Sequence, residues 1–407
     1  MKIISSKADP GDQLITPERR LSSSFFSITI IIIGGFTCTG CLKASNSYKC
    51  GIIIGTLVNI VIGLITLFAL RLGVTTMKHT KLFYADQIWA SFSPRTRIIS
   101  TFIVFITSFS FVIWYYRYVV SLVQRFLSLT IHDTPKILNN TFAICAIVMV
   151  IVTTRYYANQ SLRYIIIMTY IKYFVLIFMF IINIYMIFKL GISHSITLVS
   201  VTPQNLLDCV TTHVSIYCGM MLFYAYIWQM RTFTSNRGNK CCNISIFMIF
   251  LIHQIFGITG YLLFGNDQNG VMIDNFPPEE LVTKIDYACF IVLVAISIPV
   301  LFQPCHRALL HYFYPVDPFP NEVWAISGIS LMVLGISLLV LQGTLSKLMY
   351  FIMDFFSGIL CFILPAILYL GAVKKKKTIF NIVGCIFLIM LGIAYCSLMV
   401  FNYFVLS

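Results

Sequence analysis

The sequence predicts an all-α polytopic membrane protein, and hydrophobicity, low charge content and the length of the apolar runs are the observations behind that prediction. Of its 407 residues, 59% are hydrophobic and only 10% are charged, which leaves too little polar surface for a water-soluble domain. Eleven apolar runs each come close to the roughly 20 residues that a helix needs to cross a bilayer. We therefore expect eleven transmembrane helices surrounded by a lipid bilayer.

The predicted spans follow one another with little chain between them, as a five-plus-five arrangement with one helix appended. In chain order they are Ser24–Leu42, Gly51–Leu72, Ile98–Tyr118, Leu138–Thr154, Tyr164–Phe188, Leu206–Met230, Ile244–Phe264, Ile285–Phe302, Trp324–Leu341, Leu345–Leu370 and Ile379–Phe404. The chain then divides into a tail (1–23), a first five-helix repeat (24–190), an outer loop (191–205), a second five-helix repeat (206–371), and a basic loop with the eleventh helix (372–407).

Basic residues predict the orientation in the membrane. The chain carries 28 Lys and Arg against 14 Asp and Glu, a formal net charge of +14. An amino terminus in the cytosol puts most of them, including the run Lys374 to Lys377, into cytosolic segments, as the positive-inside rule requires. Topology thus accounts for the charge, and nucleic acid is not an expected partner. The carboxyl terminus then lies outside the cell or in a lumen, in either the plasma membrane or a vacuolar or lysosomal membrane.

Two spans carry glycines at corresponding places, because each is the first span of a five-span group. The first reads IIIIGGFTCTG, with Gly34 and Gly35, and the sixth has Gly219 beside Tyr217 and Cys218. Transporters built on inverted repeats bind substrate where such helices are interrupted, since the freed backbone groups and positive half-helix ends suit a substrate carboxylate. The competing interpretation is that these glycines only let helices pack closely.

The eighth span contains a hydroxyl followed by two prolines. Ser297 precedes Pro299 and Pro304. Pro299 removes a backbone donor and exposes a carbonyl one turn back, and together with the Ser297 hydroxyl that oxygen suits a hard cation such as sodium. An ordinary proline kink is the alternative.

Ionisable side chains inside spans are costly and are functional candidates by default. Lys172 lies well inside the fifth span, where its ammonium could replace a sodium ion or exchange the coupling proton, or could instead snorkel or pair structurally. Asp354 in the tenth span and His253 in the seventh are further candidates for proton handling, although a single histidine among apolar residues is more often a hydrogen-bonded core residue.

Three stretches of the second half resemble the amino acid/auxin permease family, including its neutral and vacuolar amino acid transporters. They are GYLLFGNDQNGVMIDNFP, the following helix ACFIVLVAISIPVLFQPCHRAL, and SGILCFILPAILYL, which looks like the tenth helix of the family with Pro365 and Tyr369 in place. YAYIWQM at the end of the sixth span is a looser match, with Gln229 where an acidic residue is expected.

This resemblance implies an inverted-repeat fold of the sodium-symporter type, formed by ten helices, plus one extra helix. It also implies an amino acid substrate held at the middles of the first and sixth spans, with Ser297 at the hydroxyl position before the proline in the eighth. Carried over residue by residue, the implied substrate site is Gly34, Gly35, Thr37, Tyr217, Cys218 and Gly219. The first span departs from the family, because Phe36 and Cys41 stand where a glycine and a proline are usual.

The function expected from these observations is ion-coupled secondary transport of amino acids or related small solutes by alternating access. The coupling ion is H+ or Na+, with Ser297, Lys172 and Asp354 as ion-coupling candidates. The sequence has no nucleotide-binding loop, and neither an enzymatic activity nor a cofactor or metal centre is expected. The departures at Phe36, Cys41 and Gln229 motivate the alternative, a non-transporting amino acid sensor or receptor with the same fold.

Overall fold

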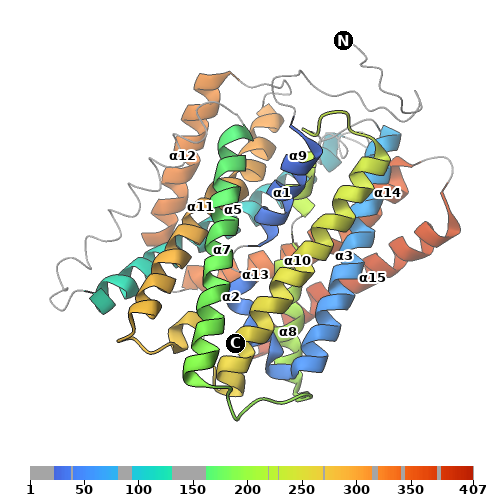
Figure 1. The fold of residues 1–407 in the computed structure, drawn as a ribbon. Coiled ribbons are helices and arrows are strands. Elements are labelled where there is room, and N and C mark those ends of the chain that lie inside the picture. Colours follow the sequence, from blue (N-terminus) through green and yellow to red (C-terminus); the bar gives the residue numbers. More distant parts are fainter. Residues whose placement is uncertain are drawn as a thin grey trace.

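The computed structural model describes residues 23–37, 40–80, 94–130, 162–218, 220–227, 229–268, 271–313, 320–340, 344–373 and 377–406. Within these ranges the chain is helical between its loops, and the one strand-like contact is an isolated parallel bridge between Ser23 and Met230. Long helices run side by side through the molecule (Figure 1). The loop 191–202 marks its lower end in that view, here called the loop end, and the start of α1, which follows Ser23, lies toward the other, here called the Ser23 end.

The described helices divide into a long and a short set. The long helices are α3 (Ile52–Thr80), α5 (Pro94–Thr130), α7 (Leu162–Leu190), α10 (Ser235–Phe264), α11 (Leu281–Phe313), α12 (Asn321–Val340) and α15 (Ile379–Phe401). The shorter ones are α1 (Phe25–Phe36), α2 (Gly40–Lys43), η2 (Ala44–Cys50), α8 (Pro203–Ile216), α9 (Met220–Ile227), η3 (Gly265–Asp267), η4 (Met272–Asn275), α13 (Thr344–Gly358), η5 (Ile359–Ile363), α14 (Leu364–Ala372) and η6 (Asn402–Leu406).

The described helices agree with the predicted spans. Seven helical stretches are long and apolar enough to cross a membrane, and each corresponds to one predicted span. α12 is apolar but shorter, and the first and sixth spans are each divided into two helices. The fourth predicted span, Leu138–Thr154, lies outside the described residues.

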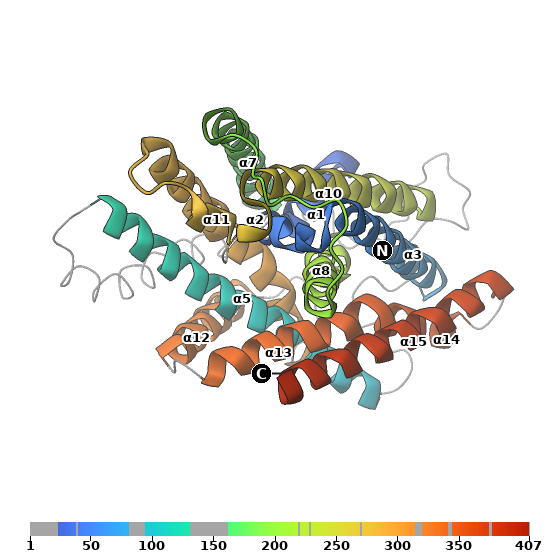
Figure 2. The same cartoon turned by 90° about the horizontal axis from the view of Figure 1, so that it is seen from below.

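Each divided span is interrupted beside its glycines. α1 ends at Phe36, and Thr37 leaves helical geometry with ψ near 73° while its N–H and its hydroxyl both donate to the Ile33 carbonyl at 3.0 Å. α8 ends at Ile216, and its last turn is closed by the Tyr217 N–H donating to the His213 carbonyl. Bonds of this kind occupy carbonyls that a terminating helix leaves without intrahelical partners. Seen from below, α1 and α8 lie in the middle of the bundle, with α10 and α3 along one side and α5 and α13 along the other (Figure 2).

Tyr48 of η2 fixes the spacing of two long helices. Its ring lies against Gly55 of α3 and Gly257 of α10. A Cβ atom added to Gly55 would lie only 2.8 Å from Cδ1 of the Tyr48 ring. The side chain is fully buried, and its hydroxyl donates to Gln254 Oε1 at 2.8 Å. Burial raises the pKa of the Tyr48 phenol well above its usual range, so the hydroxyl stays a donor at physiological pH. Glycine at both places is what makes room for the ring.

A proline of α11 leaves a carbonyl that another helix satisfies. Proline has no N–H, so Pro304 cannot donate to the Val300 carbonyl four residues earlier. Tyr226 of α9 supplies the missing donor, because its hydroxyl bonds that carbonyl at 3.2 Å. The second tyrosine of the YAYIWQM stretch therefore joins the second half of the divided sixth span to the eighth.

A candidate substrate cavity between the two divided helices

A cavity of about 100 Å³ lies where the two divided helices meet. Its walls come from both interruptions and from α5, α11 and α13, and the lining residues are Gly35, Phe36, Gly40, Lys43, Phe111, Trp114, Tyr115, Thr211, Thr212, Ser215, Ile216, Cys218, Leu222, Leu301, Met353 and Asp354. Thr211 and Thr212, about one turn to the loop-end side of the interruption after Ile216, are partly exposed, whereas Gly35 and Phe36 are buried. The cavity therefore runs from the interruptions toward the loop end.

On the opposite side of the interruptions, backbone contacts join two segments at the Ser23 end. The Ser23 N–H donates to the Gln229 carbonyl at 2.9 Å, and the Arg231 N–H donates to the Ser23 carbonyl at 2.8 Å. These two bonds, here called the Ser23 bridge, tie the start of α1 to the chain just after α9. Gln229, where the sequence resemblance led us to expect an acidic residue, is 3% exposed and its side chain bonds the Ala225 carbonyl at 3.0 Å.

The sequence-predicted substrate residues divide into two sets. Gly35 and Cys218 line the cavity, whereas Gly34, Thr37 and Tyr217 are buried beside it. Gly219 lies outside the described residues. Tyr217 points away into a polar contact, donating from its hydroxyl to Asn59 Oδ1 at 2.8 Å.

The glycines of the first span also permit close packing. A Cβ on Gly34 would lie 2.6 Å from Thr169 Cγ2 of α7, and one on Gly35 would lie 2.8 Å from Leu222 Cδ1 of α9. Close packing was the competing interpretation of these glycines, and it applies to both. For Gly35 it coexists with a place in the cavity wall.

Lys172 reaches the interruption of α1. Its ammonium donates a hydrogen bond to the Gly34 carbonyl, and the side chain is only 2% exposed. The next residue, Tyr173, donates from its hydroxyl to the Ile30 carbonyl one turn earlier at 2.9 Å. A cation at the carboxyl end of a helix is favourable, because the last carbonyls carry partial negative charge and lack intrahelical partners. α7 thus caps the end of α1 with a buried charge rather than snorkelling to a surface.

The remaining ion-coupling candidates lie apart from one another. Ser297 is fully buried in α11, where its hydroxyl donates to the Leu293 carbonyl at 2.7 Å, and it does not line the cavity. Asp354 of α13 does line it, and Ser215 of α8 donates to Asp354 Oδ1 at 2.9 Å. His253 is fully buried and bonds the Ile249 carbonyl of its own helix through Nδ1 at 2.8 Å.

Sequence reasoning missed the basic and aromatic side of the cavity. The Lys43 ammonium lies 4.7 Å from the centre of the Trp114 ring and 5.5 Å from that of Tyr350, and Trp114 Nε1 donates to the Tyr350 hydroxyl at 2.6 Å. Lys43 directly follows the predicted end of the first span, where a basic residue ordinarily indicates a membrane boundary. Trp114, one of four tryptophans in the chain and four residues from the end of the predicted third span, was the available signal.

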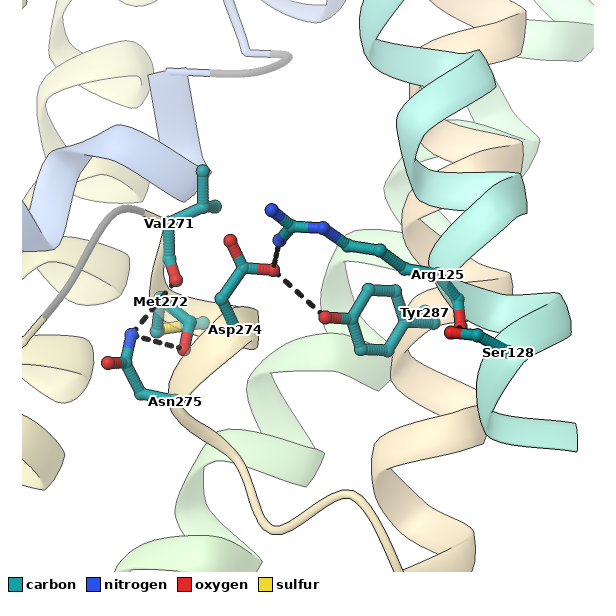
Figure 3. Close-up of polar contacts among 7 residues, drawn as sticks. All are labelled: Arg125, Ser128, Val271, Met272, Asp274, Asn275 and Tyr287. Atoms are coloured by element: carbon teal, nitrogen blue, oxygen red, sulfur yellow. Dashed lines mark hydrogen bonds and ion pairs between the residues drawn. The ribbon is translucent and has the colours of Figure 1, made fainter. Parts of the chain in front are cut away.

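A second polar cluster holds the loop that follows α10. Arg125, near the end of α5, forms an ion pair with Asp274 of η4, and Tyr287 of α11 donates to the same carboxylate at 2.9 Å (Figure 3). Asn275 bonds the Val271 and Met272 carbonyls within the loop, at 3.0 and 3.3 Å. The cluster joins three elements at the loop end, outside the cavity.

Replacing Arg125 with Gln, or Asp274 with Asn, should each lower the thermal stability of the detergent-purified protein modestly. The Arg125 side chain is 51% exposed, and an ion pair in such a place contributes at most about 1 kcal/mol because solvent screens it. The double variant should lose no more stability than the more affected single variant, and about 0.5 M salt should reduce all three differences. Ser128→Ala, which removes only a bond within α5, is the matched control. Additive losses that ignore salt would contradict the ion pair.

Comparison with known proteins gives both a family and a fold. The model of a family described as "Transmembrane amino acid transporter protein" matches residues 22–406. Among solved structures, MhsT in complex with L-phenylalanine has a TM-score of 0.64 at 11% identity, covering 95% of this chain and 100% of that one.

Two further structures show the same fold. Mhp1, a nucleobase-cation-symport-1 family transporter with bromovinylhydantoin bound, has a TM-score of 0.60 at 12% identity, covering 99% of this chain and 98% of its own. A manganese transporter of Eremococcus coleocola has a TM-score of 0.59 at 13% identity, covering 97% and 92%. These likenesses confirm the predicted all-α inverted-repeat fold of the sodium-symporter type.

Proposed function

The chain belongs to the transmembrane amino acid transporter family, as its resemblance to amino acid/auxin permeases predicted, and we propose that it is an ion-coupled secondary transporter working by alternating access. The observation that carries the proposal is the cavity between the two divided helices, which extends from the interruptions toward the loop end, with the Ser23 bridge on the other side. Opening the Ser23 bridge while closing the loop end would exchange the side from which that cavity is reached. The substrate class proposed is amino acids or related small solutes.

Lys172 supports a proton as the coupling ion. A buried ammonium on the end of α1 occupies the place where a cation would stabilise the interrupted helix, so no sodium ion is needed there. Release of its proton would remove the charge that holds α7 to α1, and α1 could then move. Sodium coupling would instead use Ser297, whose hydroxyl is engaged by the Leu293 carbonyl of its own helix.

One observation favours the second candidate, a sensor that binds an amino acid without transporting it. Phe36 forms part of the cavity wall directly at the interruption of α1. A bulky ring at that place occupies space near the backbone that a substrate would otherwise approach. A sensor with this fold would bind its ligand and change conformation without completing the transport cycle.

Transport and its coupling can be measured in proteoliposomes that contain the purified protein. The twenty proteinogenic L-amino acids are tested for counterflow against the same amino acid trapped inside, and the best one is then tested under ion gradients. We expect saturable exchange and accumulation of the amino acid inside the vesicles when the medium outside is the more acidic side. Replacing sodium with choline should not reduce this uptake. Binding without exchange above empty vesicles would favour the sensor, and uptake that needs sodium would contradict proton coupling.

A further inference from the structure

Two side chains of opposite charge type line the cavity within electrostatic range of each other but without direct contact. Lys43 belongs to α2 and Asp354 to α13, and both side chains are partly exposed and part of the cavity wall. Both residues are described, and they form no ion pair with each other: Lys43 lies against aromatic rings, and Asp354 accepts a bond from Ser215. The cavity is therefore dipolar, with a positive group on one wall and a negative group on another.

Each charge is held in position by its own neighbours. The stacked contact of the Lys43 ammonium with Trp114 and Tyr350 is a cation–π interaction, and the Trp114–Tyr350 hydrogen bond fixes the two rings relative to each other. The Ser215 hydroxyl, from α8, orients the Asp354 carboxylate. Neither charge has to rearrange to receive a ligand, and preorganisation of this kind favours binding.

Separated charges in an otherwise apolar membrane protein are expensive until an opposite charge reaches them. A zwitterion supplies both opposite charges on one small molecule, and it would satisfy the two groups together with charge-assisted hydrogen bonds. Most of the rest of the wall is apolar, with Phe36, Leu222 and Leu301 on the side of the interruption. Because Phe36 fills that side, the charged end of a ligand has its strongest partners on α2 and α13 rather than at the backbone of α1.

We infer that the cavity binds its amino acid through side chains, with the substrate carboxylate at Lys43 and the substrate ammonium at Asp354 and Ser215. This inference rests on the proposed function and adds to it the residues that read the two charges common to all amino acids. It moves Asp354 from the ion-coupling candidates to the substrate site. The substrate side chain then faces the apolar wall formed by Phe36, Leu222 and Leu301.

The test pairs changes in the protein with changes in the ligand. The probes are the L-amino acid that gives the strongest exchange in proteoliposomes, its methyl ester, which lacks the negative charge, and its N-acetyl derivative, which lacks the positive one. Affinities of all three are measured by calorimetry with detergent-purified protein, for the unaltered chain and for Lys43→Gln and Asp354→Asn. Lys284→Gln and Asp208→Asn, which change residues outside the cavity wall, are the matched controls.

Loss of one charge-assisted contact should weaken binding about ten- to a hundredfold. Lys43→Gln should therefore weaken binding of the amino acid by that factor. It should change the affinity for the methyl ester by no more than about twofold, because the ester has no carboxylate to contact Lys43. Asp354→Asn should do the same for the amino acid and spare the N-acetyl derivative. Lys43→Arg and Asp354→Glu, which keep the charges, should retain most of the preference, and size-exclusion profiles establish that each variant is folded.

The outcomes separate this inference from the proposed function. Suppose that the unaltered protein binds an amino acid, but that each variant lowers the affinity for all three ligands equally or for none of them. The side-chain site is then wrong, and the transporter proposal stands. If no amino acid binds or exchanges, both are overturned. The site is supported if each variant weakens binding only of the ligands that carry the charge it would contact.

Discussion

Replacing Lys172 with methionine should reduce substrate accumulation in proteoliposomes to about a tenth or less of the wild-type level and remove its response to a pH gradient. Methionine keeps much of the length of the side chain but leaves the Gly34 carbonyl without its charged donor, at the buried end of α1. A hydrogen bond to a charged group contributes about 1.5–3 kcal/mol, which corresponds to roughly ten- to a hundredfold in a conformational equilibrium.

Two further variants give this experiment its controls. Lys172→Arg keeps a permanent charge that does not release its proton, so it should bind substrate yet fail to accumulate it under a pH gradient. Lys189→Met makes the same change on the same helix at a surface ion pair with Glu280, and it should transport normally. Sodium-dependent uptake that survives Lys172→Met would refute the role proposed for this lysine.

Replacing Gly257 with alanine should destabilise the protein by about 1–3 kcal/mol, the usual cost of overpacking a filled interior. The added methyl group would overlap Tyr48 Cε2, and the ring cannot withdraw easily because it is fully buried and bonded to Gln254. Thermal unfolding of the purified protein measures the loss. The same substitution at Gly335 of α12 is the control, because there a Cβ meets Phe109 at an ordinary 3.6 Å.

A double variant identifies the ring as the cause. Tyr48→Leu removes the overlapping atoms. The double variant Gly257→Ala with Tyr48→Leu should therefore lose less stability than the two single variants added together, by about 1 kcal/mol or more. Tyr48→Phe keeps the ring and removes only the hydroxyl, so it should give no such relief. Additive losses for Tyr48→Leu would mean that the methyl group clashes elsewhere.

The apolar runs were sufficient to predict the helical architecture, and the helix ends were not predicted as well. The third span was predicted as Ile98–Tyr118, whereas α5 runs from Pro94 to Thr130. Hydropathy predicts the part of a helix that matches the bilayer, but a helix continues as long as its backbone bonds are satisfied. Arg125 in this extension pairs with Asp274, which no local pattern could have predicted because the two belong to separate elements.

The candidate site was predictable only where one span carried the whole signal. Glycines located both interruptions, whereas the sequence left open whether Lys172 faces inward or snorkels, and the structure shows it buried. Lys43 and Asp354 line one cavity only because α2 and α13 both pack against α8, which is a property of packing. Tyr217 was expected in the substrate site and faces Asn59 instead, because the direction of a side chain at an interruption depends on local backbone angles.

The Ser23 bridge consists of main-chain atoms alone, so the side chains at its positions can change without loss of the two bonds. Ser23 and Arg231 contribute N–H groups and Ser23 and Gln229 contribute carbonyls, so almost any amino acid at these positions would make the same two bonds. Proline is the exception at 23 and 231, since it has no N–H to donate. Substitutions can therefore accumulate there over generations while the bridge at this end is inherited unchanged, and its importance would leave no trace in residue identity.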